Sequence, residues 1–326
     1  MFDLNEFPPL VSLAPMAGVT DVPFRRQVKR FGGRYCVSEM VASDQLARQR
    51  IDMVRRAMGA EALKPLVIQL AGRESRWMAE GARLAEAAGA DVIDINMGCP
   101  AKSVTSGACG SALMRAPDHA LRLIEATVNA TTLPVTLKMR LGWDHASLNA
   151  ARLAKRAEDA GVRMLTIHGR TRQQFFRGQA DWAAIAPVVQ AVRIPVIANG
   201  DIATAADARR ALAQSGAAGV MIGRAAQGKP WLPAEIERAL RDGDEVGAPP
   251  TSRLLQSLLD LYDDALAFYD RPLGVRVARK HIAWMIDAVF GDAARERRKS
   301  ICVLEDPAAV RAALVALFEP QLAEAA

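Results

Sequence analysis

Cys99 is the residue of this chain best suited to take part in chemistry, because it stands in a Gly-Cys-Pro tripeptide directly after an apolar run. An ordinary cysteine thiol has a pKa of about 8.5, so it is mostly protonated at neutral pH and can donate a proton. With a lowered pKa it would be a nucleophile. Burial as a small apolar residue is the commoner role of cysteine, and Cys36 and Cys302 fit it. Cys109, in a Ser-Gly-Ala-Cys-Gly loop, is a second candidate for the same chemistry.

Lys138 and His168 each end another apolar run. A buried lysine is costly unless it meets an anion. An electron-rich ring that becomes anionic on reduction would serve, and His168 could donate a hydrogen bond to the same ring. The simpler interpretation of Lys138 is a salt bridge. The other histidines do not cluster with His168, and no His, Cys and carboxylate set has ligand spacing, so we expect no metal site.

Glycines that follow two later apolar runs indicate a phosphate site. Gly200 and Gly223 would let the backbone approach an anion closely, and Arg224 would add positive charge. Tight turns are the alternative explanation for both glycines. The run from Gly223, G-R-A-A-Q-G-K-P, is one residue short of a P-loop and has Pro230 where magnesium needs Ser or Thr, so we expect no triphosphate hydrolysis. No G-x-G-x-x-G occurs, which leaves a Rossmann dinucleotide site without support.

Short apolar, β-branched runs recur between these residues and are typical of parallel strands that are buried on both faces. The eight runs are Ser12–Met16, Tyr35–Met40, Leu66–Gly72, Val92–Gly98, Pro134–Arg140, Met164–Arg170, Ile194–Asp201 and Gly219–Ala226. Amphipathic, alanine-rich stretches between them predict helices. Eight strand–helix units in about 240 residues favour an α/β fold of the (β/α)8 TIM-barrel type over an open doubly wound sheet.

In such a barrel the active site lies at the C-terminal ends of the strands. Polar and reactive residues of this chain gather at those ends, whereas the strand bodies are apolar. In chain order, the strand-end residues are Pro15, Met16, Ala17, Gln69, Asn96, Cys99, Lys138, Arg140, His168, Asn199, Gly200, Asp201, Gly223 and Arg224. We therefore predict that they meet in one site.

A Gly- and Pro-rich stretch, Asp242–Ser252, predicts a linker. We accordingly divide the chain into a barrel domain at residues 1–243 and a small C-terminal all-helical domain at residues 244–326. Helical patterns occupy Arg253–Tyr269, Val275–Val289 and Pro307–Glu319, and none of the tail is strand-like. Arg276, Arg279 and Lys280 stand at i, i+3 and i+4, so we expect one cationic face. It is either a solvated surface or a contact for a phosphate backbone.

The overall composition limits the class of protein. With 51% hydrophobic and 24% charged residues, the chain is an ordinary globular one and neither disordered nor collagen-like. Its 42 basic and 36 acidic residues give a net charge of +6, which suits a polyanionic partner. No apolar run is long enough for a membrane span. Four widely separated cysteines suit reduced thiols in a cytoplasmic protein.

Taken together and in order, the strand-end motifs resemble those of the tRNA-dihydrouridine synthases, flavoproteins that reduce uridine in transfer RNA. The motifs are A-P-M-A-G-V-T-D, S-E-M, I-N-M-G-C-P-A-K, L-K-M-R-L-G-W, I-H-G-R-T, I-A-N-G-D-I and M-I-G-R-A-A-Q-G-K-P-W. The tail segment Gly274–Trp284 resembles the helical RNA-binding domain of that family. The pattern is most similar to the bacterial B-type branch, except that the loop Ser106–Cys109 lacks a basic residue that many B-type members carry.

The resemblance implies FMN as cofactor, NADPH as reductant and a D-loop uridine of tRNA as substrate. It places FMN against Pro15, Met16, Ala17 and Gln69, its ring at Lys138 and His168, and its phosphate end at Asn199, Gly200, Asp201, Gly223 and Arg224. It makes Cys99 the acid that protonates C5 of uracil after hydride addition at C6. The substrate contacts that it implies are Asn96, Arg140, Arg276, Arg279 and Lys280.

Two other functions stay open from the sequence. One is a small-molecule flavin reductase of the dihydroorotate or dihydropyrimidine dehydrogenase type, which would not need the cations of the tail helix. The other is an RNA-binding protein that kept a flavin fold without turnover, and the presence of Cys99 and Lys138 argues against it. We expect a monomer without membrane or metal partners.

Overall fold

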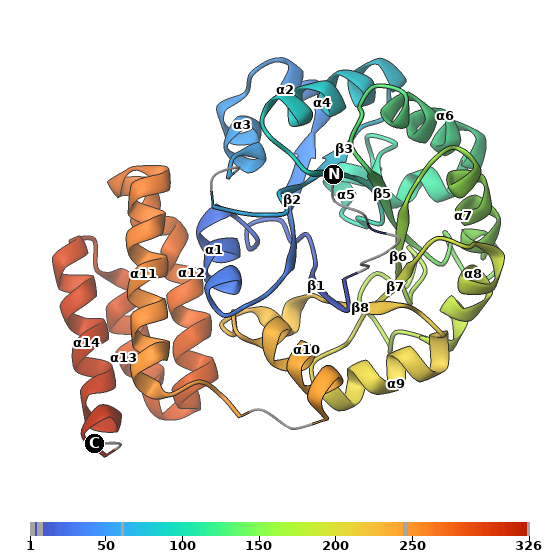
Figure 1. The fold of residues 1–326 in the computed structure, drawn as a ribbon. Helices are drawn as coiled ribbons and strands as arrows, with labels where there is room; N and C mark the ends of the chain where they lie inside the picture. The colour runs from blue at the N-terminus through green and yellow to red at the C-terminus, as the bar shows by residue number, and fades with distance from the viewer. Residues whose placement is uncertain (1–3, 5–8, 60–61, 244–246, 325–326) are drawn as a thin grey trace.

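The computed structural model describes residues 4, 9–59, 62–243 and 247–324. Eight parallel strands pair in the order β1 to β8 and close into a barrel, with helices around it and a helical region after it (Figure 1). This confirms the predicted (β/α)8 TIM barrel and excludes the open sheet. Within the described residues, no helix combines the length and apolarity that a bilayer span requires.

The strands begin and end close to the predicted runs. They are β1 (Val11–Leu13), β2 (Tyr35–Ala42), β3 (Val67–Ala71), β4 (Val92–Met97), β5 (Val135–Arg140), β6 (Met164–His168), β7 (Val196–Asn199) and β8 (Gly219–Ile222). Several are shorter at the C-terminal end than predicted, because the apolar run continues past the last strand pairing into the loop at the barrel mouth. The run Gly219–Ala226, for example, contains β8 and a 3₁₀ turn.

Helices fill the connections between the strands. Those of the barrel are α1 (Val22–Arg30), α2 (Ser43–Ala47), α3 (Ile51–Ala57), α4 (Ser75–Ala87), α5 (Lys102–Thr105), α6 (Pro117–Val128), α7 (Ala150–Asp159), α8 (Ala186–Ala191), α9 (Ala205–Ser215) and α10 (Leu232–Asp242). Short 3₁₀ segments are η1 (Gly110–Arg115), η2 (Ala183–Ile185), η3 (Arg224–Ala226) and, in the tail, η4 (Gly291–Ala294).

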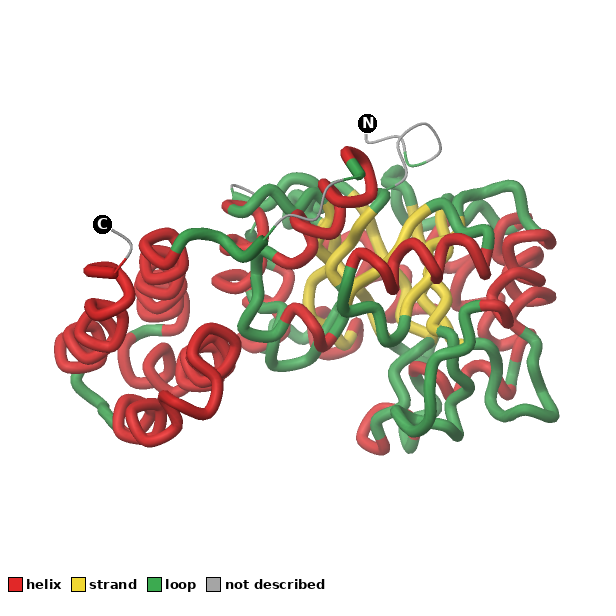
Figure 2. The backbone as a smooth tube through the Cα atoms, turned by 90° about the horizontal axis from the view of Figure 1, so that it is seen from below, coloured by secondary structure: helices red, strands yellow, loops and turns green. Residues whose placement is uncertain are grey.

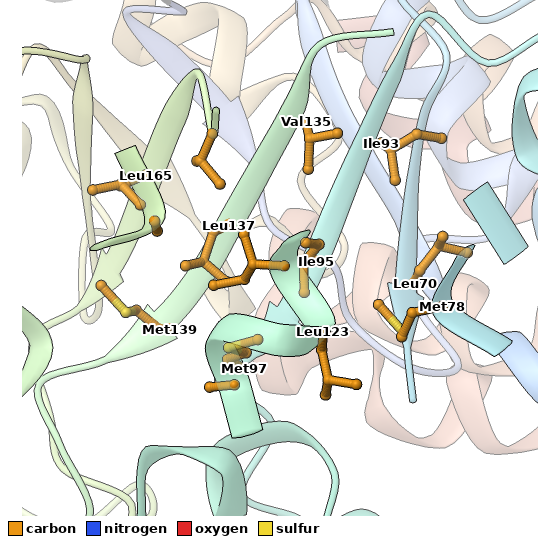
Figure 3. Close-up of a cluster of buried hydrophobic side chains, with 14 of the residues drawn as sticks. Leu70, Met78, Ile93, Ile95, Met97, Leu123, Val135, Leu137, Met139 and Leu165 are labelled. Atoms are coloured by element: carbon orange, nitrogen blue, oxygen red, sulfur yellow. The ribbon is translucent and has the colours of Figure 1, made fainter. Parts of the chain in front are cut away.

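Strand residues alternate between two environments, as the two-residue period of a strand requires. On β4, Ile93 and Ile95 pack outward in a cluster that includes Met78 of α4 and Leu123 of α6 (Figure 3). Asp94, between them in sequence, forms hydrogen bonds to neighbouring strands instead. The outer core therefore anchors each strand, and this anchoring fixes the positions of the polar side chains that face inward.

The tail consists of α11 (Thr251–Tyr269), α12 (Arg271–Phe290), α13 (Arg295–Val303) and α14 (Pro307–Glu324). It has its own apolar core, which includes Leu258, Ile282 and Phe318. We did not predict α13, because its sequence R-E-R-R-K-S-I-C-V buries only Ile301 and lacks an apolar period. Part of the predicted linker is helical, since α10 ends at Asp242 and α11 begins at Thr251, and residues 244–246 lie outside the described residues.

The tail packs against one side of the barrel (Figure 2). Helix α1 supplies part of this contact: Ser257 Oγ donates a hydrogen bond of 3.1 Å to the Gln27 amide oxygen, and Tyr269 Oη donates one of 3.0 Å to Asp21. The turn after β8 supplies another part. Gly228 has a φ of +71°, and a Cβ there would lie 2.2 Å from the carbonyl oxygen of Trp284 on α12. The P-loop-like sequence thus contains a glycine that packing against the tail requires.

Candidate active site

A cavity of about 760 Å³ opens at the C-terminal ends of the strands. Every strand-end residue predicted from the sequence lines it, from Pro15 in the loop after β1 to Arg224 after β8. The structure thereby brings together residues that are up to about 200 positions apart in the chain, because the closed strand order directs each strand end to the same rim.

A hydrogen-bond chain runs from the barrel interior to Cys99. Asp94 accepts a 2.6 Å hydrogen bond from Gln69 Nε2, and Gln69 Oε1 accepts one of 2.7 Å from Asn96 Nδ2. Thr136 Oγ1 donates to the other oxygen of Asp94, and burial raises the pKa of this carboxyl group. Asn96 Oδ1 then accepts the backbone N–H of Cys99 at 3.1 Å. Asn96 therefore fixes the backbone that presents the thiol.

The loop that contains Cys99 is held by hydrogen bonds within the loop. Ser111 donates to the Cys99 carbonyl through its N–H at 3.1 Å and its hydroxyl at 2.9 Å. Gly110 has a φ of +58°, and a Cβ there would lie 2.8 Å from the same carbonyl oxygen. Cys109 does not line the cavity, and burial raises the pKa of its thiol. The geometry therefore favours Cys99 over Cys109 as the reactive cysteine.

Lys138 is a buried cation whose hydrogen bond goes to an amide. Its Nζ donates to Asn199 Oδ1 at 2.9 Å, and no carboxylate of the described residues pairs with it. The simpler interpretation, a salt bridge, is therefore wrong. Burial, with the nearby Arg140 charge, lowers the pKa of Lys138 to about 8. A buried cation on a cavity wall, without an ion-pair partner among the described residues, is suited to an electron-rich or anionic ligand.

Asn199 also determines the protonation of His168. Asn199 Nδ2 donates to the Met221 carbonyl at 2.8 Å, which leaves Oδ1 as the acceptor that faces His168 Nδ1 at 2.8 Å. Burial and the positive charges of Lys138 and Arg140 hold the pKa of His168 well below its usual range, so the ring is neutral at pH 7. Its single proton accordingly resides on Nδ1, and Nε2 accepts from Arg170 at 3.3 Å.

The two glycines of the predicted phosphate site differ. Gly200 has a φ of +119°, and a Cβ there would lie 2.7 Å from Ala180 Cβ, so its turn and its packing explain it. At Gly223 the nearest atom to an added Cβ would be Ala14 Cβ at 4.0 Å, so the protein's own packing does not require a glycine. Gly223 leaves open space on the cavity wall, beside the cation of Arg224.

Asp201 is held by arginines. Its carboxylate accepts hydrogen bonds from Arg170, with Nη1 at 3.0 Å, and from Arg224 at 3.3 Å. Burial opposes ionisation, but the hydrogen bonds from Arg170 and the charges of both arginines outweigh it, so the pKa of Asp201 is lowered. The carboxylate thus positions Arg170 and Arg224. Sequence reasoning missed Arg170, although it stands inside the H-G-R-T motif.

A family model described as dihydrouridine synthase matches residues 12–318. The chain belongs to the dihydrouridine synthase family. A probable tRNA-dihydrouridine synthase of Rhodobacter capsulatus is 55% identical to it over 312 residues, which cover 95% of each chain. One from Rhizobium leguminosarum bv. phaseoli is 49% identical over 93% of each chain. The tRNA-dihydrouridine synthase B of Pseudomonas putida is 45% identical over 94% of this chain and 90% of that protein. The family resemblance seen in the motifs is thus confirmed.

The tail cations Arg276, Arg279 and Lys280 have different surroundings. Arg276 is exposed, but Arg279 Nη2 donates to the Leu304 carbonyl at 3.1 Å, inside the tail. Lys280 lines a second cavity of about 190 Å³ between tail and barrel, near Gly18 and Tyr269. Arg279 therefore turns into the tail and does not share an exposed face with Arg276, and the prediction that these cations contact RNA stays a prediction.

The cavity also contains two aromatic residues that sequence reasoning missed. Phe175 and Phe176, in the loop after β6, line the cavity and remain exposed. The signal was present in the sequence, since two adjacent phenylalanines stand in the otherwise polar stretch T-R-Q-Q-F-F-R-G-Q. The described residues contain no cluster of three or more His, Cys, Asp or Glu that could hold a metal ion.

Proposed function

We propose that this enzyme is an FMN- and NADPH-dependent tRNA-dihydrouridine synthase that reduces the C5=C6 bond of a D-loop uridine in tRNA. One observation carries the proposal: Cys99 and the buried cation Lys138 line the same cavity, in a chain whose relatives are named for this activity on tRNA. The free state of all four cysteines suits the cytoplasm, where we place the reaction.

The residues present fit FMN. The cavity volume of about 760 Å³ lies within the range typical of ligand pockets, roughly 300–1,000 Å³. Lys138 and neutral His168 would hold the electron-rich ring, with Gln69 and the Pro15–Ala17 loop beside it. Gly223, the Gly200–Asp201 turn and Arg224 would hold the phosphate end. Bound FMN would supply hydride chemistry, with NADPH as the source of the electrons.

Cys99 would supply the proton that completes the reduction. Addition of hydride at C6 leaves negative charge on C5 and the conjugated carbonyl oxygen of uracil. The Cys99 S–H bond breaks as the C5–H bond forms, and solvent returns a proton to the thiolate. A proton donor held close to the reacting carbon is what such a step needs. Asn96 holds the Cys99 backbone at 3.1 Å and thereby keeps the thiol at the cavity.

Arg140 would contact the substrate while it is hydrogen-bonded to the loop that contains Cys99. Its Nε donates to the Gly98 carbonyl at 2.8 Å, and its Nη1 donates to Thr171 and Phe175 carbonyls at 2.9 Å. Among the described residues, Nη2 has no hydrogen-bond partner and is left for a uracil oxygen. Burial lowers the pKa of Arg140 to about 10, so it remains charged at neutral pH.

The proposal is tested with the purified protein and tRNA that lacks dihydrouridine. Acid-released cofactor should run as FMN, and nucleoside mass spectrometry should show dihydrouridine that depends on NADPH. Release of FAD would overturn the cofactor assignment. Reduction of free pyrimidines without any reduction of tRNA would favour the small-molecule reductase instead.

A further inference from the structure

The loop after β6 carries an aromatic pair that the mechanism above does not use. Phe175 is 40% exposed and Phe176 is 43% exposed, although both line the cavity. Their ring centroids lie 4.6 Å apart in an edge-to-face arrangement. Adjacent exposed rings at the mouth of a ligand cavity mark a surface that meets a partner.

The two rings differ in what covers them. The guanidinium of Arg224 lies 4.9 Å from the centre of the Phe176 ring, and that of Arg140 lies 5.6 Å from it. Within the described residues, the one ring or cation contact of Phe175 is with Phe176. An edge-to-face neighbour covers at most one face of a ring. With 40% of the residue exposed, Phe175 therefore keeps aromatic surface in contact with solvent.

The backbone of Phe175 gives a second, independent observation. Its φ is +55°, in the left-handed region that a bulky side chain adopts only under constraint. The constraint comes from two hydrogen bonds, Phe175 N–H to the Arg172 carbonyl at 3.0 Å and Arg140 Nη1 to the Phe175 carbonyl at 2.9 Å. Glycine would fit this turn with less strain, so fold stability does not account for the phenylalanine.

We propose that Phe175 is a stacking platform for a nucleobase of the RNA, next to the base that enters the cavity. Every nucleobase offers a flat π face, and an aromatic ring beside cations is a common way to bind single-stranded nucleic acid. Arg177 is exposed and follows the ring by two residues, so it would complement a phosphate of the RNA. The proposal rests on the proposed function and deepens it.

Four variants test this role. Phe175→Gly removes both the ring and the strain, Phe175→Leu removes the ring but keeps the strained backbone, and Phe175→Tyr keeps the ring. Gln49→Gly is the matched control, because Gln49 is exposed with a φ of +56° and does not line the cavity. Each variant is measured for the Kd of tRNA at fixed salt, the KM of NADPH and the midpoint of thermal unfolding.

We expect Phe175→Gly and Phe175→Leu to raise the Kd of tRNA by roughly 5- to 150-fold, the range for loss of one base–aromatic stack. Phe175→Tyr should bind like the wild type, and the KM of NADPH should not change. Phe175→Gly should unfold at the same or a slightly higher temperature, as Gln49→Gly should.

Unchanged tRNA affinity of Phe175→Gly or Phe175→Leu would overturn the proposal. So would a changed KM for NADPH at unchanged tRNA affinity, which would assign the ring to nicotinamide. A loss of thermal stability in Phe175→Gly but not in Gln49→Gly would show that the ring serves the fold. If the wild type itself makes no dihydrouridine in tRNA, it is the proposed function that fails.

Discussion

The barrel mouth and helix α12 both contain polar or charged residues that we picked out from the sequence, but only those of the mouth all meet at one site. Lys138, His168 and Asn199 come from three strands and meet within hydrogen-bond distance. Arg276, Arg279 and Lys280 lie within five residues and have three different surroundings. The order of a closed barrel fixes where each strand ends. Helical spacing determines only from which side of the helix a side chain projects. The packing of neighbouring helices determines which groups it contacts.

Replacement of Cys99 by alanine should have the largest effect on the mouth. Dihydrouridine formation should fall about 10²- to 10⁴-fold, the typical loss when a positioned acid is removed. FMN content and NADPH oxidation should persist, since we assign Cys99 no role in binding FMN or NADPH. Nucleoside mass spectrometry gives the product, and absorbance gives the other two. Cys109→Ala is the control and should be close to wild type, whereas an inactive Cys109→Ala beside an active Cys99→Ala would transfer the role to Cys109.

Gly228→Ala tests the place where the two regions touch. The new Cβ would meet the Trp284 carbonyl, so we expect the free energy of unfolding to fall by about 2–3 kcal/mol. Gly243→Ala separates the effect of the backbone from that of the clash, because Gly243 has a φ of +82° with nothing within 4 Å of an added Cβ. It should cost only about 1 kcal/mol. Denaturant unfolding measures both, and equal losses would show that the close approach to α12 contributes nothing.

Lys138→Met tests whether the buried cation of the barrel mouth binds FMN. The variant should bind FMN roughly 10- to 150-fold more weakly at pH 7, as expected for a lost hydrogen bond from a charged group. Because the pKa of Lys138 is about 8, FMN binding to wild-type apoprotein should weaken as the pH rises through 8. Lys138→Met should lose that dependence. A titration of flavin fluorescence at several pH values measures both effects, and an unaltered pH profile would exclude Lys138 as its source.

The same pKa predicts how the stability of the apoprotein changes with pH. The ordinary pKa of lysine is 10.5, so between about 8 and 10.5 the unfolded chain binds more protons than the folded one. The contribution of Lys138 therefore makes the free energy of unfolding rise with pH in that window. Denaturant unfolding of wild type and Lys138→Met across this range should show the rise in the wild type alone.

The smallest effects are expected for the tail cations, where Arg276 and Arg279 should differ in what their replacement changes. Arg276→Ala should weaken tRNA binding a few-fold and lower its salt slope by about one, with no change in unfolding. Arg279→Ala should instead lower the free energy of unfolding by about 1 kcal/mol, because it removes the hydrogen bond to Leu304. Salt titrations and denaturant unfolding measure the pair. A loss of salt slope in Arg279→Ala without loss of stability would restore the shared cationic face.

The sequence predicted the barrel and its mouth well because strand ends are marked locally. An apolar run whose last residues include Lys138 or His168 predicts both the strand and its functional end. Arg170 could not be assigned in this way, since its role depends on Asp201, which follows a different strand. Helix α13 escaped because charged residues dominate it. The direction of Arg279 depends on Leu304, and no spacing within α12 contains that information.

The contact of Gly228 with Trp284 has a consequence for chimeras between relatives. A crossover placed in the linker would separate Gly228 and Trp231 from the helices that they touch, although Trp231 is part of the tail core. In a chimera, the residues that follow Ala226 must come from the same parent as the tail. The same holds for Gln27 and Asp21 at helix α1, which form hydrogen bonds to the tail. The unit of exchange is therefore discontinuous in sequence. Chimeras that exchange this whole unit should keep the tail packed against the barrel. Chimeras joined at the linker should lose the contacts that position the tail on the barrel.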